Sequence, residues 1–273
     1  MEQYWWLTPV GLVIGAFATL VGAGGGFILA PVLLLLYPEE SPETVTSISL
    51  AVVFFNSLSG SIAYARAKRI DYRSGLIFSA ATIPGAILGA LTTPLIPRGL
   101  FDFAFGILMV GASIFLFYCA RREAPIQPHQ LRRHLADPPA NGHVAGSPLS
   151  YSSAVGAGIC FLVGYITSLL GVGGGFIEVP AMVYVLNFPV HVATATSQFI
   201  VGVMALTGSA THWVAGLFQH GVRRTIALSI GVVLGAQLGA RLSGRVHGDW
   251  IIRGLAAALA LVGARLIVLV FQA

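Results

Sequence analysis

The chain has 273 residues, of which 56% are hydrophobic and only 9% charged, with a formal net charge of +5. A typical soluble domain has about 25% charged residues, and apolar runs of about 18 residues or more, long enough to cross a bilayer, recur along this chain. The composition therefore excludes a soluble globular protein and predicts an all-α polytopic membrane protein. Because the basic residues cluster at the ends of apolar segments, as membrane topology requires, they do not indicate nucleic acid binding.

The first apolar segment, residues 5–36, is interrupted at residues 22–31 by the sequence GAGGGFILAP. Its 32 residues would span about 48 Å as one helix, whereas the hydrocarbon core is only about 30 Å thick. We therefore expect the segment to break at residues 22–26 and either to bend steeply or to turn back as a re-entrant pair. The residues before it lack a basic region and a cleavage site, so we expect mature sequence. Tyr4, Trp5 and Trp6 are typical of an interfacial aromatic anchor.

Three further apolar segments, residues 44–65, 74–95 and 101–119, complete the first half. The segment of residues 74–95 contains Gly85 and Gly89, a pair typical of close helix packing. The segment of residues 44–65 carries a polar stripe at helical spacing, formed by Thr46, Ser49, Asn56, Gly60 and Tyr64.

Residues 121–150 are polar, rich in proline and basic, and we interpret them as a cytoplasmic linker between two membrane domains, residues 1–120 and 151–273. The linker histidines lack metal-ligand spacing, and the two cysteines are isolated in apolar surroundings. We therefore predict no metal site, no disulfide and no cofactor. The residues concerned are His129, His134, His143, Cys119 and Cys160.

The second half repeats the features of the first in the same order. A second glycine decapeptide, GVGGGFIEVP at residues 171–180, follows the first at an offset of 149. Ser197 corresponds to Ser49 at an offset of 148, and Gly235 to Gly85 at 150. Glycine-interrupted segments at corresponding places in two halves are the best sequence indication of a transporter's binding site. A purely structural alternative is that the glycines serve helix packing.

The two decapeptides, each followed by a Ser/Thr-rich helix and then by GAILGA at Gly85 or GAQLGA at Gly235, resemble the TauE/SafE family, also called the 4-toluene sulfonate uptake permease family. The resemblance covers both halves and excludes the linker. It implies an inner-membrane permease that moves sulfite, sulfonates such as sulfoacetate, or related sulfur-containing anions, commonly outward. It also implies two repeats of inverted topology that enclose the anion. The two motifs differ at one place, where the second has Glu178 and the first Leu29.

The residues also favour an anion site on physical grounds. If each break ends one half-helix and begins another, unpaired backbone N–H groups and a positive dipole end face an anion without any buried cation. Side-chain hydroxyls and an amide on the neighbouring striped helices could add donors, although Ser and Thr often bond to the carbonyl four residues back instead. The predicted substrate-binding residues are Gly24, Gly25, Gly26, Phe27, Ser49, Gly173, Gly174, Gly175, Phe176, Ser197 and Gln198.

Few ionisable residues lie within the apolar segments, and two of them are candidates for proton coupling. Charge at membrane depth indicates function by default. Glu178 either exchanges a proton or is a neutral carboxyl that caps the half-helix. His212 is either a structural interfacial histidine or a proton relay. We expect Arg265 to extend its charge to the membrane surface and Arg241 to be a surface anchor, with attraction of the substrate as the alternative for Arg241.

No catalytic motif accompanies these residues, so we predict a transporter and not an enzyme. The alternative function is a permease or channel for another small ion, either a metal cation or another anion. The expected partners are a small sulfur-containing anion and the lipid bilayer, with a homo-oligomer left open. The expected location is the inner membrane of a bacterium.

Charge does not decide the topology. If each glycine segment is a simple span, the halves are parallel and ten basic residues lie on the cytoplasmic side. If each glycine segment is re-entrant, each repeat has three full transmembrane helices, the halves are inverted and eleven basic residues lie on the cytoplasmic side. Segment length and the family resemblance favour inversion.

Overall fold

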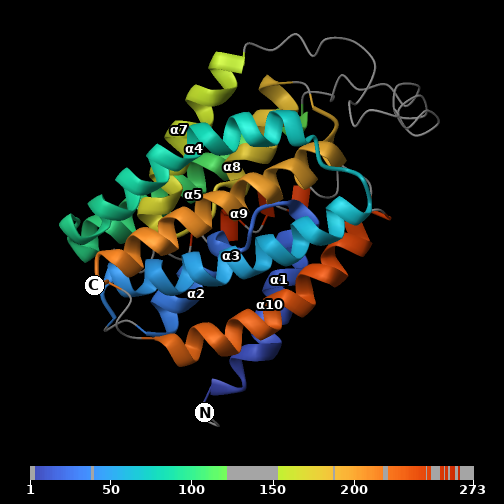
Figure 1. The fold of residues 1–273 in the computed structure, drawn as a ribbon. Helices are drawn as coiled ribbons and strands as arrows, with labels where there is room; N and C mark the ends of the chain where they lie inside the picture. Colours follow the sequence, from blue (N-terminus) through green and yellow to red (C-terminus); the bar gives the residue numbers. More distant parts are fainter. Residues whose placement is uncertain are drawn as a thin grey trace.

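The computed structural model describes residues 4–37, 40–121, 153–186, 188–217, 221–243 and 245–246, and single positions between 253 and 264. Helices account for nearly all of this part of the chain, and no strand occurs in it (Figure 1). The prediction of an all-α protein is therefore confirmed for the residues described.

The first half contains the helices that the apolar segments predict. The glycine-interrupted segment forms two helices, so the predicted break at residues 22–26 is confirmed. A 3-10 turn, η2 (Thr93–Leu95), extends the fourth helix. In chain order the helices are α1 (Leu7–Val21), α2 (Gly26–Leu36), α3 (Pro42–Arg66), α4 (Tyr72–Thr92) and α5 (Arg98–Arg121).

In the described part of the second half, the helices follow an order similar to that of α1–α4. Its short helix α8 continues directly into η3, a stretch of π-helix. The elements are α7 (Ser153–Leu170), α8 (Gly175–Pro180), η3 (Ala181–Val185), α9 (Val190–Val214) and α10 (Val222–Ser243). Four of the described helices, α3, α4 with η2, α9 and α10, are long and apolar enough to cross a membrane.

Helices of one half pack against helices of the other. α1 lies along α10, and α4 lies along α7. The contacts are close because glycines face backbone: a Cβ on Gly235 would collide with the Leu12 carbonyl oxygen, and one on Gly85 with that of Phe161. The prediction that these GxxxG segments serve close packing is confirmed.

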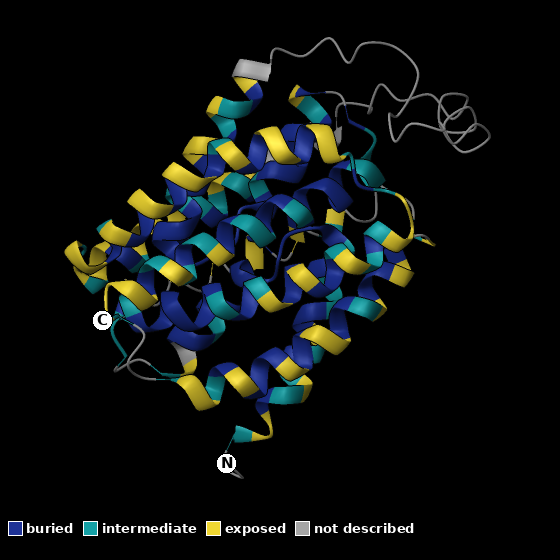
Figure 2. Ribbon diagram, in the orientation of Figure 1, coloured by how far each residue is buried: buried dark blue, intermediate teal, exposed yellow. Residues whose placement is uncertain are grey.

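The centre of the molecule is formed by α3 and α9, which cross each other between α4 and α10. Gly60 faces Gln198 while Gly208 faces Leu50, so the two helices run in opposite directions. Figure 2 shows buried residues along these central helices and exposed residues on the outer helices. Many of the exposed side chains are large and apolar, as a surface in contact with lipid requires.

Both ends of the glycine-interrupted pair α1–α2 lie beside one arginine. The Arg224 guanidinium stacks 3.8 Å from the ring centre of Tyr37, just after α2, and 5.8 Å from that of Tyr4, just before α1. Arg224 also forms an ion pair of 2.7 Å with Glu40. The chain therefore runs into the molecule along α1 and returns along α2 to the same end of the bundle.

Some predictions fall on residues outside the part of the chain that the structure describes. They concern almost all of the linker with its three histidines, Arg265, and the side chain of Cys119. Among the described residues, Cys160 is a buried free thiol and Arg241 is exposed.

Candidate functional site at the two glycine breaks

The first break is a left-handed turn that only glycine adopts readily. Helix α1 ends at Val21 and is capped by Gly22, with a φ of 80°, and the N–H of Ala23 still donates to the Ala18 carbonyl at 2.9 Å. Gly24 and Gly25 follow with φ of 73° and 93°, and α2 then begins at Gly26. Residues with a Cβ are strained in this region, so the backbone itself requires glycine at residues 22, 24 and 25.

The second break has the same form with one difference. Gly171 and Gly173 have φ of 68° and 75°, whereas Gly174 has a φ of −66°. Gly174 therefore has an ordinary helical conformation, and Gly25, its counterpart in the first motif, does not. The two motifs are similar in sequence but not equivalent in conformation.

The two breaks lie against each other in the interior. A Cβ on Gly26 would collide with the Val172 carbonyl oxygen, and a Cβ on Gly175 with that of Gly22. The rings of Phe27 and Phe176, which follow these glycines, are 6.2 Å apart and fully buried. The structure thus brings the two predicted glycine motifs together.

The starts of α2 and α8 leave backbone donors without acceptors. Within the described residues, the N–H groups of residues 24–27 and 173–176 make no hydrogen bond, whereas the next two N–H groups of each helix bond to Gly25 or Gly174. A helix start leaves such N–H groups unpaired, and they attract negative charge.

The two predicted serines connect the breaks crosswise. Ser49, on α3, donates to the Gly171 carbonyl at 2.5 Å. Ser197, on α9, lies 3.3 Å from the Gly22 carbonyl and 3.1 Å from Glu178 Oε2. Both hydroxyls therefore point at the breaks, but they bind carbonyl oxygens here. Their role as anion donors stays a prediction.

Glu178 is a buried carboxyl group at the second break. Its Oε2 contacts Ser197, and its Oε1 has no partner among the described residues. That oxygen lies beside the start of α8, since a Cβ on Gly174 would be 2.9 Å from it. The described residues offer Glu178 no ion pair. The proton and cap interpretations both remain open.

Gln198 belongs to a hydrogen-bonded chain at the first break. Its Nε2 donates to Thr19 Oγ1 at 3.3 Å, Thr19 donates to Asn56 Oδ1 at 3.3 Å, and Asn56 Nδ2 donates to the Gly24 carbonyl at 3.1 Å. The sequence predicts Asn56 in the polar stripe but not in the site, and it does not predict Thr19. The polar stripe itself was the signal for Asn56.

His212 is buried away from the breaks, near the other end of α9. The Ser47 hydroxyl donates to the Glu43 carbonyl at 2.6 Å and lies 2.8 Å from His212 Nδ1, and both contacts are hydrogen bonds when Nδ1 carries the ring proton. Nε2 of the neutral ring is then an acceptor, and it has no partner in the described part of the chain. The contact fits a structural role and does not test a relay.

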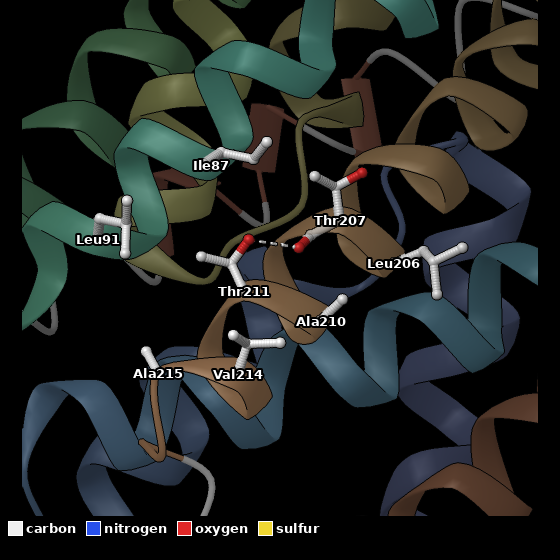
Figure 3. A pocket seen from close by; sticks show the side chains of 8 residues that line it. All are labelled: Ile87, Leu91, Leu206, Thr207, Ala210, Thr211, Val214 and Ala215. Atoms are coloured by element: carbon white, nitrogen blue, oxygen red, sulfur yellow. Dashed lines mark hydrogen bonds between the residues drawn. The ribbon is translucent and has the colours of Figure 1, made fainter.

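A surface pocket lies elsewhere, between α4 and α9 (Figure 3). Its two hydroxyls, from Thr207 and Thr211, bond to carbonyls of their own helix. Several lining residues are at least half exposed on the apolar outer surface, such as Val214 and Leu91. With no charged side chain in its lining, this pocket is suited to lipid and not to an anion. It is lined by Ile87, Leu91, Leu206, Thr207, Ala210, Thr211, Val214 and Ala215.

Comparison with known proteins gives one family. The profile described as "Sulfite exporter TauE/SafE" matches residues 7–266. The probable membrane transporter protein YunE of Bacillus subtilis is 36% identical over 219 residues, which cover 77% of this chain and 78% of YunE. The probable membrane transporter protein MJ0441 of Methanocaldococcus jannaschii is 24% identical over 206 residues, covering 74% and 68%. No solved structure matches the chain. The glycine-broken helices thus lie in a membrane transporter, and the chain belongs to the TauE/SafE family.

Proposed function

We propose that this transporter exports sulfite or an organosulfonate such as sulfoacetate across the bacterial inner membrane. The observation that carries the proposal is the meeting of two buried helix breaks whose backbone N–H groups, at residues 24–27 and 173–176, have no acceptor among the described residues. Converging N–H groups at helix starts bind a tetrahedral or pyramidal oxyanion without a desolvated cation. The family description agrees with this class of substrate.

The anion lies between the two breaks in this proposal. In the arrangement described, Ser49 and Ser197 hold the carbonyls of the opposite break. An anion that enters competes for these hydroxyl protons, because a charged acceptor makes the stronger hydrogen bond. Binding of the substrate therefore loosens the contact between the breaks, and the transport cycle begins with that release.

Two inverted repeats are the architecture that we infer for this cycle. Each of these contacts between the halves has a counterpart one repeat offset away in the sequence. The packing of α1 against α10 corresponds to that of α7 against α4, and the hydrogen bond from Ser49 to Gly171 corresponds to that from Ser197 to Gly22. The opposite directions of α3 and α9 support an axis in the membrane plane. Inverted repeats place the substrate near the midplane, between discontinuous helices.

Thermal-shift titration of the purified chain tests the substrate class. Sulfite and sulfoacetate should each raise the melting temperature in detergent, and chloride at the same concentration should not. A saturating ligand at about 100 times its Kd stabilises by about 2.7 kcal/mol, which is a measurable shift. Stabilisation by chloride alone would contradict the proposal.

Glu178 is the proposed site of proton coupling. Glu178→Gln keeps the size and the hydrogen bond with Ser197 but cannot release a proton, so it should retain sulfoacetate binding and lose the pH dependence of flux. The measurement is sulfoacetate transport in proteoliposomes between pH 6 and about 8, where the ligand keeps its charge because carboxyl groups ionise near about pH 4. Glu43→Gln, in the first turn of α3, is the control. An unchanged pH profile in Glu178→Gln would leave Glu178 as a structural cap.

Transport of a cation is the second candidate, and one observation favours it. Glu178 Oε1 has no described partner, and Ser197 links the carboxyl group to the Gly22 carbonyl. Carboxylate and carbonyl oxygens are the ligands that hard cations prefer. Uptake of radiolabelled sulfite and of metal ions into the same vesicles separates the two functions: uptake of the metal without sulfite would favour the cation.

A further inference from the structure

Two fully buried polar atoms at the first break have no partner among the described residues. They are Ser57 Oγ, on α3, and Gln198 Oε1, on α9. Ser57 Oγ is directed at the break, since a Cβ on Gly24 would lie 3.3 Å from it. Buried polar groups without a partner are rare in proteins, and each one calls for an explanation such as a ligand.

Both atoms belong to one contact between α3 and α9. Ser57 faces Gly202, whose added Cβ would be 3.5 Å from the Ser57 Cβ, and Gly60 faces Gln198. Gly60 is three positions after Ser57 in α3, which corresponds to a rise of about 4.5 Å along the helix. The two unpaired atoms therefore lie within about one helical turn of each other along this crossing.

The hydrogen bonds of this chain determine which side-chain atoms are donors and which are acceptors. The Gly24 carbonyl only accepts, so Asn56 must present its Nδ2 there, which leaves its Oδ1 to accept the single proton of Thr19. Thr19 can then only accept from Gln198, so the Gln198 amide presents Nε2. Its unpaired Oε1 is therefore an acceptor that needs a donor.

The other side of the same site has unused donors. The Ser57 hydroxyl has no described acceptor, and neither have the N–H groups of residues 24–27. These donors suit an oxyanion, whereas Gln198 Oε1 would repel one. A ligand that satisfies all of them needs negative oxygens at one end and a donor at the other.

We propose that the first break recognises an oxyanion that also carries a hydrogen-bond donor, whether a hydroxyl, an ammonium group or an acid proton. The oxyanion binds Ser57 and the free N–H groups, and the donor binds Gln198 Oε1. This inference rests on the proposed function and narrows its substrate class: sulfoacetate, whose carboxyl group is ionised at neutral pH and carries no donor, should bind less tightly than a sulfonate that has one. The second break lacks the arrangement: the residues 148 positions from Ser57, Asn56 and Gln198 are Ala205, Met204 and Leu50.

Two sulfonates that differ in a single hydroxyl group test the proposal. The probes are isethionate, which is 2-hydroxyethanesulfonate, and ethanesulfonate, titrated by calorimetry against the purified full chain. Isethionate should bind at least about tenfold more tightly, the effect of one buried hydrogen bond gained in place of an unpaired acceptor. Equal affinities in the unmodified protein would overturn the inference.

The variant Gln198→Leu tests whether Gln198 causes the preference for isethionate over ethanesulfonate. The variant should bind isethionate and ethanesulfonate with equal affinity. Gln237→Leu, which removes an amide that bonds to Ser59 on another face of α3, should keep the full preference. Thr19→Val is the second variant. It removes the acceptor that fixes the orientation of the Gln198 amide, so Oε1 is no longer held towards the ligand and the preference should weaken.

The outcomes separate the inference from the proposed function. A preference for isethionate that survives both Gln198→Leu and Thr19→Val overturns the inference and leaves the sulfonate permease intact. Failure of isethionate, ethanesulfonate and sulfite alike to bind the unmodified protein overturns the proposed function, and the inference with it.

Discussion

Gly26 and Gly175 are the residues through which the two breaks touch. Each presents its Cα hydrogen where a side chain would collide with a carbonyl oxygen of the opposite break. We expect Gly26→Ala and Gly175→Ala each to reduce the free energy of unfolding by about 1–3 kcal/mol, the usual effect of overpacking. Denaturation midpoints in detergent measure it.

Gly158→Ala is the matched control. Gly158 lies within α7, and an added Cβ there meets nothing within 4 Å. Alanine is the better helix former by up to about 1 kcal/mol, so this variant should be as stable as the unmodified chain or more stable. If Gly26→Ala were equally harmless, the breaks would not touch in solution.

The requirement for glycine at single residues is predictable from the sequence, but the residues that these glycines contact are not. Three consecutive glycines inside an apolar segment favour an irregular backbone, so the break was predictable. The bond from Ser49 to the Gly171 carbonyl joins residues 122 positions apart, and no local pattern specifies it. Ser57 and Thr19 were not predicted because no feature of the sequence distinguishes their hydroxyls from those of other serines and threonines in helices.

At the scale of helices, the glycine faces of α4 and α10 hold the two halves together. Gly85→Leu and Gly235→Leu should each lower the yield of folded, monodisperse protein, because the added side chain meets backbone of α7 or α1 and cannot be accommodated. Size-exclusion chromatography in detergent measures this yield. Leu234→Ala, at an exposed neighbouring position, should leave the yield unchanged.

Helix positions followed from the sequence much better than helix partners. Apolar length and flanking polar residues are local signals, and the predicted segment 44–65 became α3 (Pro42–Arg66) with little change. Packing partners depend on distant surfaces, and GAILGA and GAQLGA offer nearly the same small-residue face. Nothing in either motif indicates that α1 pairs with α10 and not with α4.

At the scale of the whole molecule, the proposed inversion predicts where the chain ends. A reporter fused after Ala273 should be active on the external side of the membrane, and one inserted at residue 140 in the linker should be active in the cytoplasm. Alkaline phosphatase and a fluorescent protein give opposite readouts for the two sides. A cytoplasmic signal from the fusion after Ala273 would instead support parallel halves.

The exchange of helices between halves has a consequence for how the protein is made. When α4 leaves the ribosome, the helix that covers Gly85, α7, has not yet been synthesised, and α1 waits still longer for α10. At about 5–20 residues per second, the bare glycine faces persist for on the order of ten seconds. During that time the nascent half depends on lipid or on an insertion chaperone to shield it. We therefore expect a chain that stops within the linker to be degraded rapidly, although every residue of its four apolar segments is intact.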